Sequence, residues 1–257
     1  MDRLSAQHAP NVNRPGKIRV LQFGEGNFLR AFVDEMIDNL NNAEKADVGV
    51  CIAQPLDRGM VDMLREQDHL YTVMLRGREE TGDVKKTRIV RSVVDSVKIY
   101  QEFDKYLALA QNDDLRFIVS NTTEAGIVYT GKDNYNDKPQ ASFPGKLTQV
   151  LYERFKAGKG GLVILSCELI DNNGKELLKC VNQYIDQWGL EEGFQKYVNE
   201  DCTFCGSLVD RIVPGRIRDP KEVAELEEKH GCTAGCAIRD VNSGEVFLSY
   251  QEDMVFK

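Results

Sequence analysis

The chain has no run of 18 apolar residues and no excess of positive charge, since 33 Lys and Arg stand against 41 Asp and Glu. The first absence excludes an ordinary membrane span. The formal net charge of -8 argues against nucleic-acid binding, in which positive charge supplies most of the affinity. No hydrophobic stretch precedes residue 17, so no signal peptide is expected and the cytoplasm is the predicted location. Internal repeats and low-complexity segments are also absent.

Histidine is scarce, with three residues, and cysteine occurs in an odd number, seven. No histidine lies near Cys167 in the sequence, so a Cys–His nucleophilic mechanism has little support. An odd cysteine count without a secretory signal favours reduced thiols. The pairs Cys202–Cys205 and Cys232–Cys236 could together bind zinc. The first pair stands beside a hydrophobic stretch, where cysteine is commonly a small buried apolar residue, and we expect no metal site.

Hydrophobic residues make up 42% of the chain and charged residues 29%, which is typical of a globular domain with a packed core. Strands are predicted at 17–23, 48–53, 115–120 and 161–166, and helices at 27–41, 57–67, 101–112, 146–157, 174–187, 190–199, 205–213 and 219–230. Further strands at 70–76, 86–94 and 97–100 interrupt this alternation. The pattern predicts an α/β fold with a doubly wound, mostly parallel Rossmann-like sheet and an antiparallel β insertion.

The segment Ile18–Ala31 predicts a strand, a two-glycine turn and a helix, which is the order that a dinucleotide diphosphate needs. Gly24 allows a tight turn, and Gly26 lets the backbone approach the phosphates. The N–H groups and positive dipole end of the helix would then face the negative charge. Leu29 stands where a third glycine is usual. The alternative is a strand–turn–helix that uses glycine only for packing.

In open parallel sheets, ligands bind beyond the carboxyl ends of the strands. After the second strand stand Gln54, Asp57 and Arg58. An acid at this place would bond the adenosine ribose and favour NAD, whereas a basic residue could hold the 2′-phosphate of NADP. We expect NAD, and Asp57 is either a ribose ligand or a helix N-cap.

Two more strands end in polar loops. A polar run from Ser120 to Glu124 follows one of them, and it predicts either part of the nicotinamide site or a capped turn. Asn172 and Asn173 follow the other strand. They could donate to a carbonyl or alkoxide oxygen, or they could form a plain Asn-Gly turn.

At these residues the sequence resembles the polyol-specific long-chain dehydrogenases, the mannitol dehydrogenase family. The resemblance covers about residues 17–218 and is carried by Gln22–Ala31, Val119–Ile127, Phe143–Leu147, Cys167–Gly174 and Leu208–Pro214. It implies an NAD-linked, metal-independent interconversion of a sugar-acid ketone and its alcohol. The family usually has proline before the Cys-Glu pair, where this chain has Ser166.

The resemblance also implies residue roles. It places the cofactor against Gly24, Gly26, Asn27 and Phe28, and Phe23 beside them is a further predicted cofactor residue. It places the nicotinamide half near Asn121, Thr122, Thr123 and Glu124. Asn173 would face the substrate oxygen.

Members of the family carry a C-terminal helical domain with a Lys-x4-Asn-x2-His motif. Its lysine is the general base, and its asparagine and histidine bind and orient the substrate. The motif does not occur in this sequence, and the resemblance fades after about residue 218. The expected organisation is a tail at 1–16, an NAD-binding domain at 17–218, and an extension at 219–257 where the catalytic domain would begin.

The chain is therefore expected to be the cofactor domain of a two-domain oxidoreductase, as a fragment or a shortened relative. The alternative is a non-catalytic nucleotide-binding or regulatory module on the same fold. Expected partners are NAD(H), a sugar acid once the second domain is supplied, and a further copy through an apolar patch near residues 204–214. Neither nucleic acid nor a membrane is expected as a partner.

Overall fold

A computed structural model of the protein describes residues 4–6, 13–44, 46–79, 82–123, 125–209, 221, 224, 236–239 and 246–250. For 74–79, 82–87, 236–239 and 246–250 the description is limited to the backbone. The elements in chain order are β1 (Ile18–Phe23), α1 (Asn27–Ala31), α2 (Val33–Glu44), β2 (Gly49–Gln54), α3 (Val61–Glu66), β3 (Tyr71–Glu79), β4 (Gly82–Val90), β5 (Val93–Lys98), α4 (Phe103–Ala108), η1 (Leu109–Gln111), β6 (Phe117–Ser120), α5 (Phe143–Lys156), β7 (Val163–Ser166), α6 (Asn173–Trp188), α7 (Glu192–Lys196), η2 (Tyr197–Asp201), β8 (Thr203–Cys205), β9 (Cys236–Arg239) and β10 (Val246–Tyr250).

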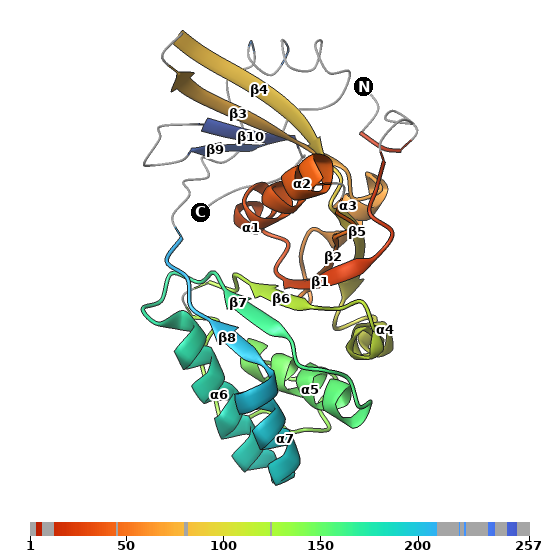
Figure 1. The fold of residues 1–257 in the computed structure, drawn as a ribbon, viewed down its shortest axis with the longest axis vertical. Helices are drawn as coiled ribbons and strands as arrows, with labels where there is room; N and C mark the ends of the chain where they lie inside the picture. The colour runs from red at the N-terminus through yellow and green to blue at the C-terminus, as the bar shows by residue number, and fades with distance from the viewer. Residues whose placement is uncertain are drawn as a thin grey trace.

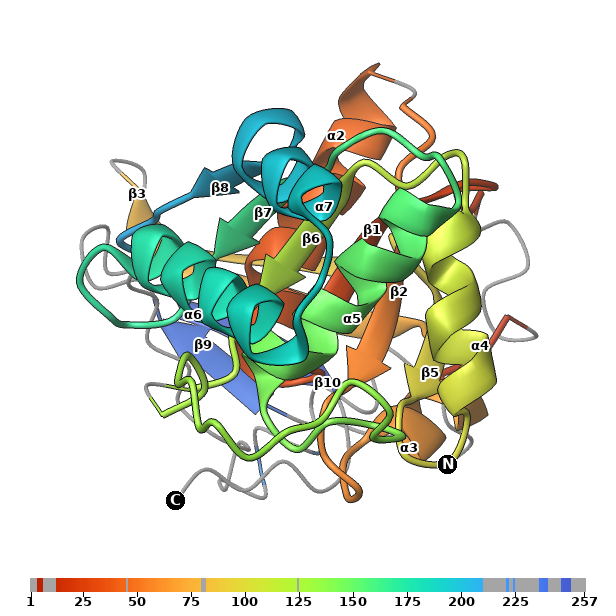
Figure 2. The same ribbon diagram turned by 90° about the horizontal axis from the view of Figure 1, so that it is seen from below.

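The main sheet has the strand order β5-β2-β1-β6-β7-β8, and each neighbouring pair is parallel. Helices α1 and α2 pack on one face of this sheet and α5, α6 and α7 on the other (Figures 1 and 2). The chain runs outward from β1 to β5 and then restarts at β6 beside β1. The predicted doubly wound parallel sheet is confirmed.

Two apolar clusters fill the space between the sheet and its helices. Alternate residues of a strand point to opposite faces, so Leu21 and Phe23 join one cluster and Val20 joins the other. All residues of β2 are buried, as expected for a parallel strand that is covered on both faces. The sheet is therefore a rigid core whose edges position the loops.

A second, antiparallel sheet has the order β4-β3-β10-β9. It lies beyond α1 and α2 as seen from the main sheet (Figure 1). This confirms the predicted antiparallel insertion, with one correction. The segment 97–100 was expected in the insertion, but β5 pairs in parallel with β2. A short strand has the same pattern in either sheet, so only its pairing partner distinguishes the two.

Two helix predictions were wrong in detail. The predicted helix 27–41 is broken at Phe32, where φ is -117° and ψ is -80°. The predicted helix 205–213 is replaced at its start by the end of the edge strand β8, which pairs in parallel with β7. Residues 210–213 lie outside the described residues, as does the predicted helix 219–230 apart from 221 and 224.

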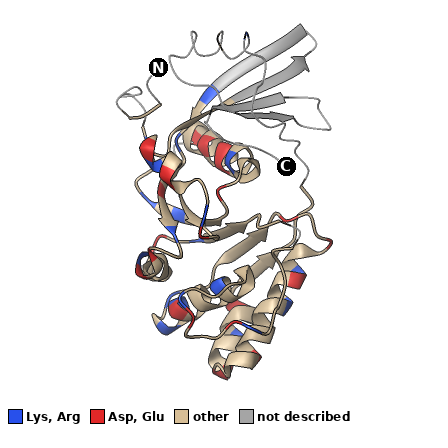
Figure 3. Ribbon diagram, turned by 180° about the vertical axis from the view of Figure 1, so that it is seen from behind, with Lys and Arg blue, Asp and Glu red and all other residues tan. Residues whose placement is uncertain are grey.

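Charged side chains of both signs intermix over the described helices (Figure 3). In the described part of the chain, no helix combines the length and the apolar character that crossing a membrane requires.

A buried carboxyl group lies between α2 and the second sheet. Asp34 is fully buried, and its Oδ2 accepts hydrogen bonds from Gln22 Nε2 and the Tyr71 hydroxyl, both at 3.3 Å. Its Oδ1 has no hydrogen-bond partner among the described residues. Burial raises the pKa of Asp34 to about 7, because the charged form loses its hydration there.

This pKa predicts a pH-dependent stability. The folded-state pKa of Asp34 lies above the ordinary value of 3.8, so the folded state keeps a proton that the unfolded state releases. The contribution of Asp34 to the free energy of unfolding is fully present below pH 3.8 and is lost as the pH rises to about 7. Chemical denaturation of wild type and Asp34→Asn across this pH range measures the free energy of unfolding of both. The value for wild type minus the value for the variant should decline as the pH rises. A difference that rises with pH would contradict the assignment.

Candidate functional site

A glycine turn joins β1 to α1 and sets the shape of the site. Gly24 has a φ of +112°, which residues with a side chain rarely adopt, and its N–H donates to Ala53 O over 3.2 Å. A Cβ on Gly24 would lie 3.1 Å from Asn121 O. The turn is therefore held between the ends of β2 and β6.

Gly26 is in a different situation. Its φ of -64° and ψ of 162° are open to any residue, and a Cβ there would meet nothing within 4 Å. Gly26 is also the N-cap of α1, and as a glycine it brings no side chain to this helix end. The space in front of Gly26, at the start of α1, is therefore open to a ligand.

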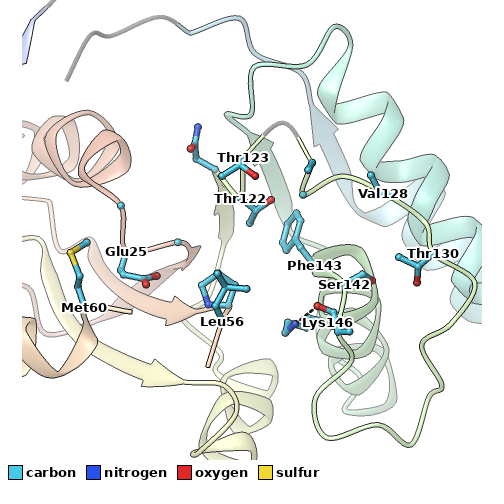
Figure 4. Close-up of a pocket in the computed structure, with 17 residues that line it drawn as sticks. Glu25, Leu56, Met60, Thr122, Thr123, Val128, Thr130, Ser142, Phe143 and Lys146 are labelled. Carbon is cyan, nitrogen blue, oxygen red and sulfur yellow. Dashed lines mark hydrogen bonds between the residues drawn. The ribbon is translucent and has the colours of Figure 1, made fainter. Parts of the chain in front are cut away.

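A pocket of about 530 Å³ opens beside the turn, where β1, β2 and β6 end and α5 begins. Its lining residues come from 24–26, 55–60, 121–130 and 141–146. Glu25 and Met60 lie on one side of it, and Phe143 and Lys146 lie on the other (Figure 4). The order of the strands reverses between β1 and β6, and such a switch point is where open α/β sheets bind ligands.

The buried carboxylate of Glu168 fixes the loop that follows β6. Its Oε1 accepts hydrogen bonds from the Thr122 N–H and hydroxyl, both at 3.0 Å, and its Oε2 accepts one from the Ser120 hydroxyl at 3.1 Å. The Asn121 side-chain amide donates to Cys167 O over 2.6 Å. The loop after β7 thus holds the loop after β6 in place along the pocket.

Comparison of the sequence with models of known protein families identifies the family of this chain. The family profile described as "Mannitol dehydrogenase Rossmann domain" matches residues 18–234. The chain belongs to the mannitol dehydrogenase family. The resemblance inferred from the sequence is thereby confirmed, and with it the assignment to a family of oxidoreductases.

Curated relatives of this family member carry the name altronate oxidoreductase. The protein of Yersinia enterocolitica is 46% identical over 236 residues, and that of Escherichia coli O1:K1 / APEC is 44% identical over 236 residues. These alignments cover 90% of this chain and 48% of each relative. The chain therefore spans about half the length of the curated relatives that it matches.

Two solved structures share the fold. One is Pseudomonas fluorescens mannitol 2-dehydrogenase in a ternary complex with NAD and D-mannitol, with a TM-score of 0.74 at 20% identity. The match covers 91% of this chain and 52% of that one. The other is D-sorbitol dehydrogenase in substrate-free form, with a TM-score of 0.70 at 20% identity, covering 90% and 51%. At this identity the likeness shows the fold alone.

Some of the predicted site residues of this mannitol dehydrogenase family member line the pocket: Gly24, Gly26, Asn121, Thr122 and Thr123. Thr123 has a φ of +75°, a rare conformation for a β-branched residue, and it turns the loop over the pocket. Glu124 lies outside the described residues. The contact of the lining residues with a cofactor stays a prediction.

Three other predicted cofactor residues, Phe23, Asn27 and Phe28, are not among the residues that line the pocket. Phe23 is fully buried, and Asn27 is 3% exposed with its Oδ1 accepting a hydrogen bond from the Arg30 guanidinium. The Phe28 ring packs on Phe32, with centroids 5.2 Å apart. The side chains of Phe23 and Asn27 are thus buried within the protein and that of Phe28 is half-buried, and the contact of these residues with a cofactor stays a prediction.

Gln54 was predicted at the adenosine ribose, but its amide is engaged within the protein. Gln54 is 2% exposed, and its Nε2 donates to Leu56 O over 3.0 Å and to Asp57 O over 3.3 Å. Its Oε1 accepts from the Val61 N–H over 3.2 Å. Gln54 therefore shapes the β2–α3 loop.

The alternative role of Asp57, as a helix N-cap, was wrong. Helix α3 begins at Val61 with Met60 as its N-cap, several residues later than predicted. Asp57 is exposed, and its Oδ1 accepts a hydrogen bond from Gln101 Nε2 over 2.5 Å. This bond ties the β2–α3 loop to the segment between β5 and α4.

Asn173 was predicted to face a substrate oxygen, and that role stays a prediction, while the structure shows what its amide bonds within the protein. Asn173 is fully buried, and its Nδ2 donates to Ser166 O, Glu168 O and Ser207 O at 3.1, 2.9 and 2.9 Å. Its Oδ1 accepts from the Ser207 and Gly174 N–H groups at 3.0 and 2.8 Å. The side chain joins β7, α6 and the segment after β8.

Sequence reasoning missed Glu25 and Lys146 as pocket residues. Both line the pocket, and burial raises the pKa of Glu25 and lowers the pKa of Lys146 to about 8. Lys146 lies in Phe143–Leu147, a segment noted only as a marker of the family. The signal that could have pointed to Lys146 was its place at the start of a predicted helix, directly after a long polar loop at the carboxyl edge of the sheet.

Among the described residues, no cluster of His, Cys, Asp or Glu could hold a metal ion. Cys202 is buried and Cys205 is half-buried, both as free thiols, and Cys232 lies outside the described residues. Burial raises the pKa of Cys167 to about 11, which disfavours a nucleophilic thiolate. Of the expected apolar patch, Leu208 is 88% exposed, and 210–214 lie outside the described residues.

Proposed function

We propose that this chain is the cofactor-binding part of an NAD-dependent oxidoreductase that converts D-tagaturonate and NADH to D-altronate. The single observation that carries the proposal is the open space in front of Gly26, at the switch point of the sheet. This cradle would be filled by any side chain, and it fits a diphosphate. Residues 17–218 form the proposed cofactor domain.

The choice of NAD over NADP follows from the wall formed by the β2–α3 loop. That wall contributes Pro55, Leu56 and Met60 to the pocket, with Glu25 beside them. A 2′-phosphate needs a basic partner, and none of the described lining residues from this loop is basic. In its ionised form, the carboxyl group of Glu25 would also repel a phosphate.

The choice of substrate is supported by the relatives named altronate oxidoreductase, at 46% and 44% identity. When bound, the nicotinamide would supply the hydride to the ketone carbon. This chain would hold the diphosphate at the glycine turn and line the nicotinamide half with Asn121, Thr122 and Thr123. The proton donor of ketone reduction is implied to be the lysine of the Lys-x4-Asn-x2-His motif, which these 257 residues do not contain.

Titration of the chain with NADH, followed by nicotinamide fluorescence, tests the binding step. We expect saturable binding, and weaker binding of NADPH. Turnover of D-tagaturonate by the isolated chain should be slower by roughly 10²–10⁴ than in a protein that carries the motif, since that is the usual loss without a general acid–base. A flat titration up to millimolar NADH, from chain shown to be folded, would refute the proposal.

A further inference from the structure

Lys146 is the one cationic side chain among the described residues that line the pocket. It extends from the first turns of α5 toward the side of the pocket where Leu56 lies (Figure 4). The residue is 1% exposed. A buried ammonium group is unfavourable unless it is hydrogen-bonded and paired with negative charge, so its place in the pocket calls for an explanation.

The protein satisfies this ammonium group only in part. Lys146 Nζ donates to Ala141 O over 2.8 Å and lies 5.2 Å from the centroid of the Tyr100 ring. An ammonium has three N–H donors, and Ala141 O is its one hydrogen-bond acceptor among the described residues. The remaining donors have no protein acceptor there and are available to a ligand in the pocket.

The loop before α5 holds Lys146 in this position. Asp133 is 3% exposed, and it accepts hydrogen bonds from the Ala141 and Ser142 N–H groups at 2.8 and 3.1 Å and from the Tyr184 hydroxyl at 2.8 Å. These bonds fix the carbonyl that Lys146 contacts. Asp133 forms no ion pair with Lys146, so the ammonium is positioned but not neutralised.

The glycine turn contributes no cationic side chain to the described lining of the pocket, although the Arg30 guanidinium of α1 donates to Glu25 O over 2.8 Å. Helix α1 has five residues and ends at the break of Phe32, so its dipole is short. The nearest charged lining residue in the turn is Glu25, whose carboxyl group is of the wrong sign for a phosphate. Among the described lining residues, the positive charge that faces a ligand in the pocket therefore comes from another element, at Lys146.

We propose that Lys146 binds the diphosphate of the dinucleotide from the wall opposite the glycine turn. The inference rests on the proposed function, because it assigns a further residue to the same cofactor. Lys146 is a binding residue here and takes no part in hydride transfer. A charge-assisted contact to phosphate makes the affinity for phosphate-bearing ligands depend on this one side chain.

Ligands that differ in their phosphates test the proposal, with equilibrium binding measured for NADH, ADP, adenosine and NADPH. Lys146→Gln should weaken the binding of NADH and of ADP by roughly 10- to 100-fold, which is the usual effect of losing one hydrogen bond to a charged group. The affinity for adenosine should change less than about twofold, because adenosine lacks phosphate. Lys146→Arg should keep much of the affinity. The matched control is Lys132→Gln, which removes the same charge from an exposed site on the loop before α5.

The pH dependence of wild-type binding gives a second measurement that needs no variant. Burial lowers the pKa of Lys146 to about 8, and Asp133 opposes this shift. The affinity for ADP should therefore fall as the pH rises from 7 to 9.5, whereas that of Lys146→Arg should stay level. The other titratable groups that face this space are Tyr100, whose ring centroid lies 5.2 Å from the ammonium, and Glu25 on the opposite side of the pocket, and neither gains positive charge in this range.

Three results would overturn the inference. The first is folded Lys146→Gln that binds NADH as tightly as wild type. The second is an equal loss for adenosine, which would mean a structural role. The third is a loss confined to NADPH, which would place the ammonium at the 2′-phosphate. A wild-type chain that binds neither NADH nor ADP would refute the proposed function itself, so the two failures are distinguishable.

Discussion

Gly26→Val is expected to leave the protein folded and to weaken NADH binding by on the order of 100-fold, since each lost hydrogen bond to a charged phosphate removes about 1.5–3 kcal/mol. The backbone of Gly26 already has a conformation that valine adopts freely, and the new side chain would meet no protein atom within 4 Å at its Cβ. It would instead fill the space in front of α1. The loss of glycine as N-cap should reduce the free energy of unfolding by less than about 1 kcal/mol.

Gly24→Ala is the matched comparison, because it changes the neighbouring glycine of the same turn. Gly24 has a φ of +112°, and a Cβ there would lie 3.1 Å from the backbone oxygen of Asn121. This variant should lose about 1–3 kcal/mol of stability from backbone strain alone. Thermal unfolding and NADH titration of both variants separate the two roles. Gly26→Val that binds NADH like wild type would show that the cofactor does not use this space.

The contrast between the two glycines shows what local sequence can predict. A strand followed by Gly-Glu-Gly and a helix start is a short-range pattern, so its position at the sheet edge and its turn geometry follow from the sequence. The order of β1, β2 and β6 follows as well, because consecutive parallel strands linked by helices have few allowed arrangements. The centre of the pocket was therefore predictable.

The walls of the pocket were less predictable, because they depend on which polar side chains the fold buries. Gln54 follows a strand as a ribose-binding acid would, yet its amide is used within the β2–α3 loop. Glu168 braces the β6 loop through atoms that are far away in sequence. Nothing in a single sequence distinguishes a side chain that faces a ligand from one that supports its neighbour.

The short elements could not be predicted from the sequence either. Strand β8 contains three residues, too few for an apolar period, and the six residues of β5 do not reveal which sheet the strand joins. The break at Phe32 separates α1 from α2 without a Gly or Pro to mark it. In each case the structure is set by the element against which the segment packs, and the local sequence pattern is compatible with either structure.

Asn173→Ala is expected to destabilise the fold by about 3–5 kcal/mol, among the larger effects of single substitutions. The amide of Asn173 makes five hydrogen bonds, all with backbone groups, and the residue is fully buried. Alanine would leave these carbonyl and N–H groups without their partner, and each buried unsatisfied group costs about 1–3 kcal/mol. Because the amide joins β7, α6 and the segment after β8, the loss should affect the whole fold.

The neighbouring Asn172 provides the control for this prediction. Asn172 is exposed, has a φ of 52° and makes no capping hydrogen bond, so Asn172→Gly should change the free energy of unfolding by less than about 0.5 kcal/mol. Chemical denaturation measures both variants. At a temperature where Asn173→Ala is still folded, its affinity for NADH should match that of wild type, because the residue does not line the pocket. If Asn173→Ala were as stable as wild type but defective in turnover, the side chain would act on the substrate after all, and the structural role argued from its hydrogen bonds would be wrong.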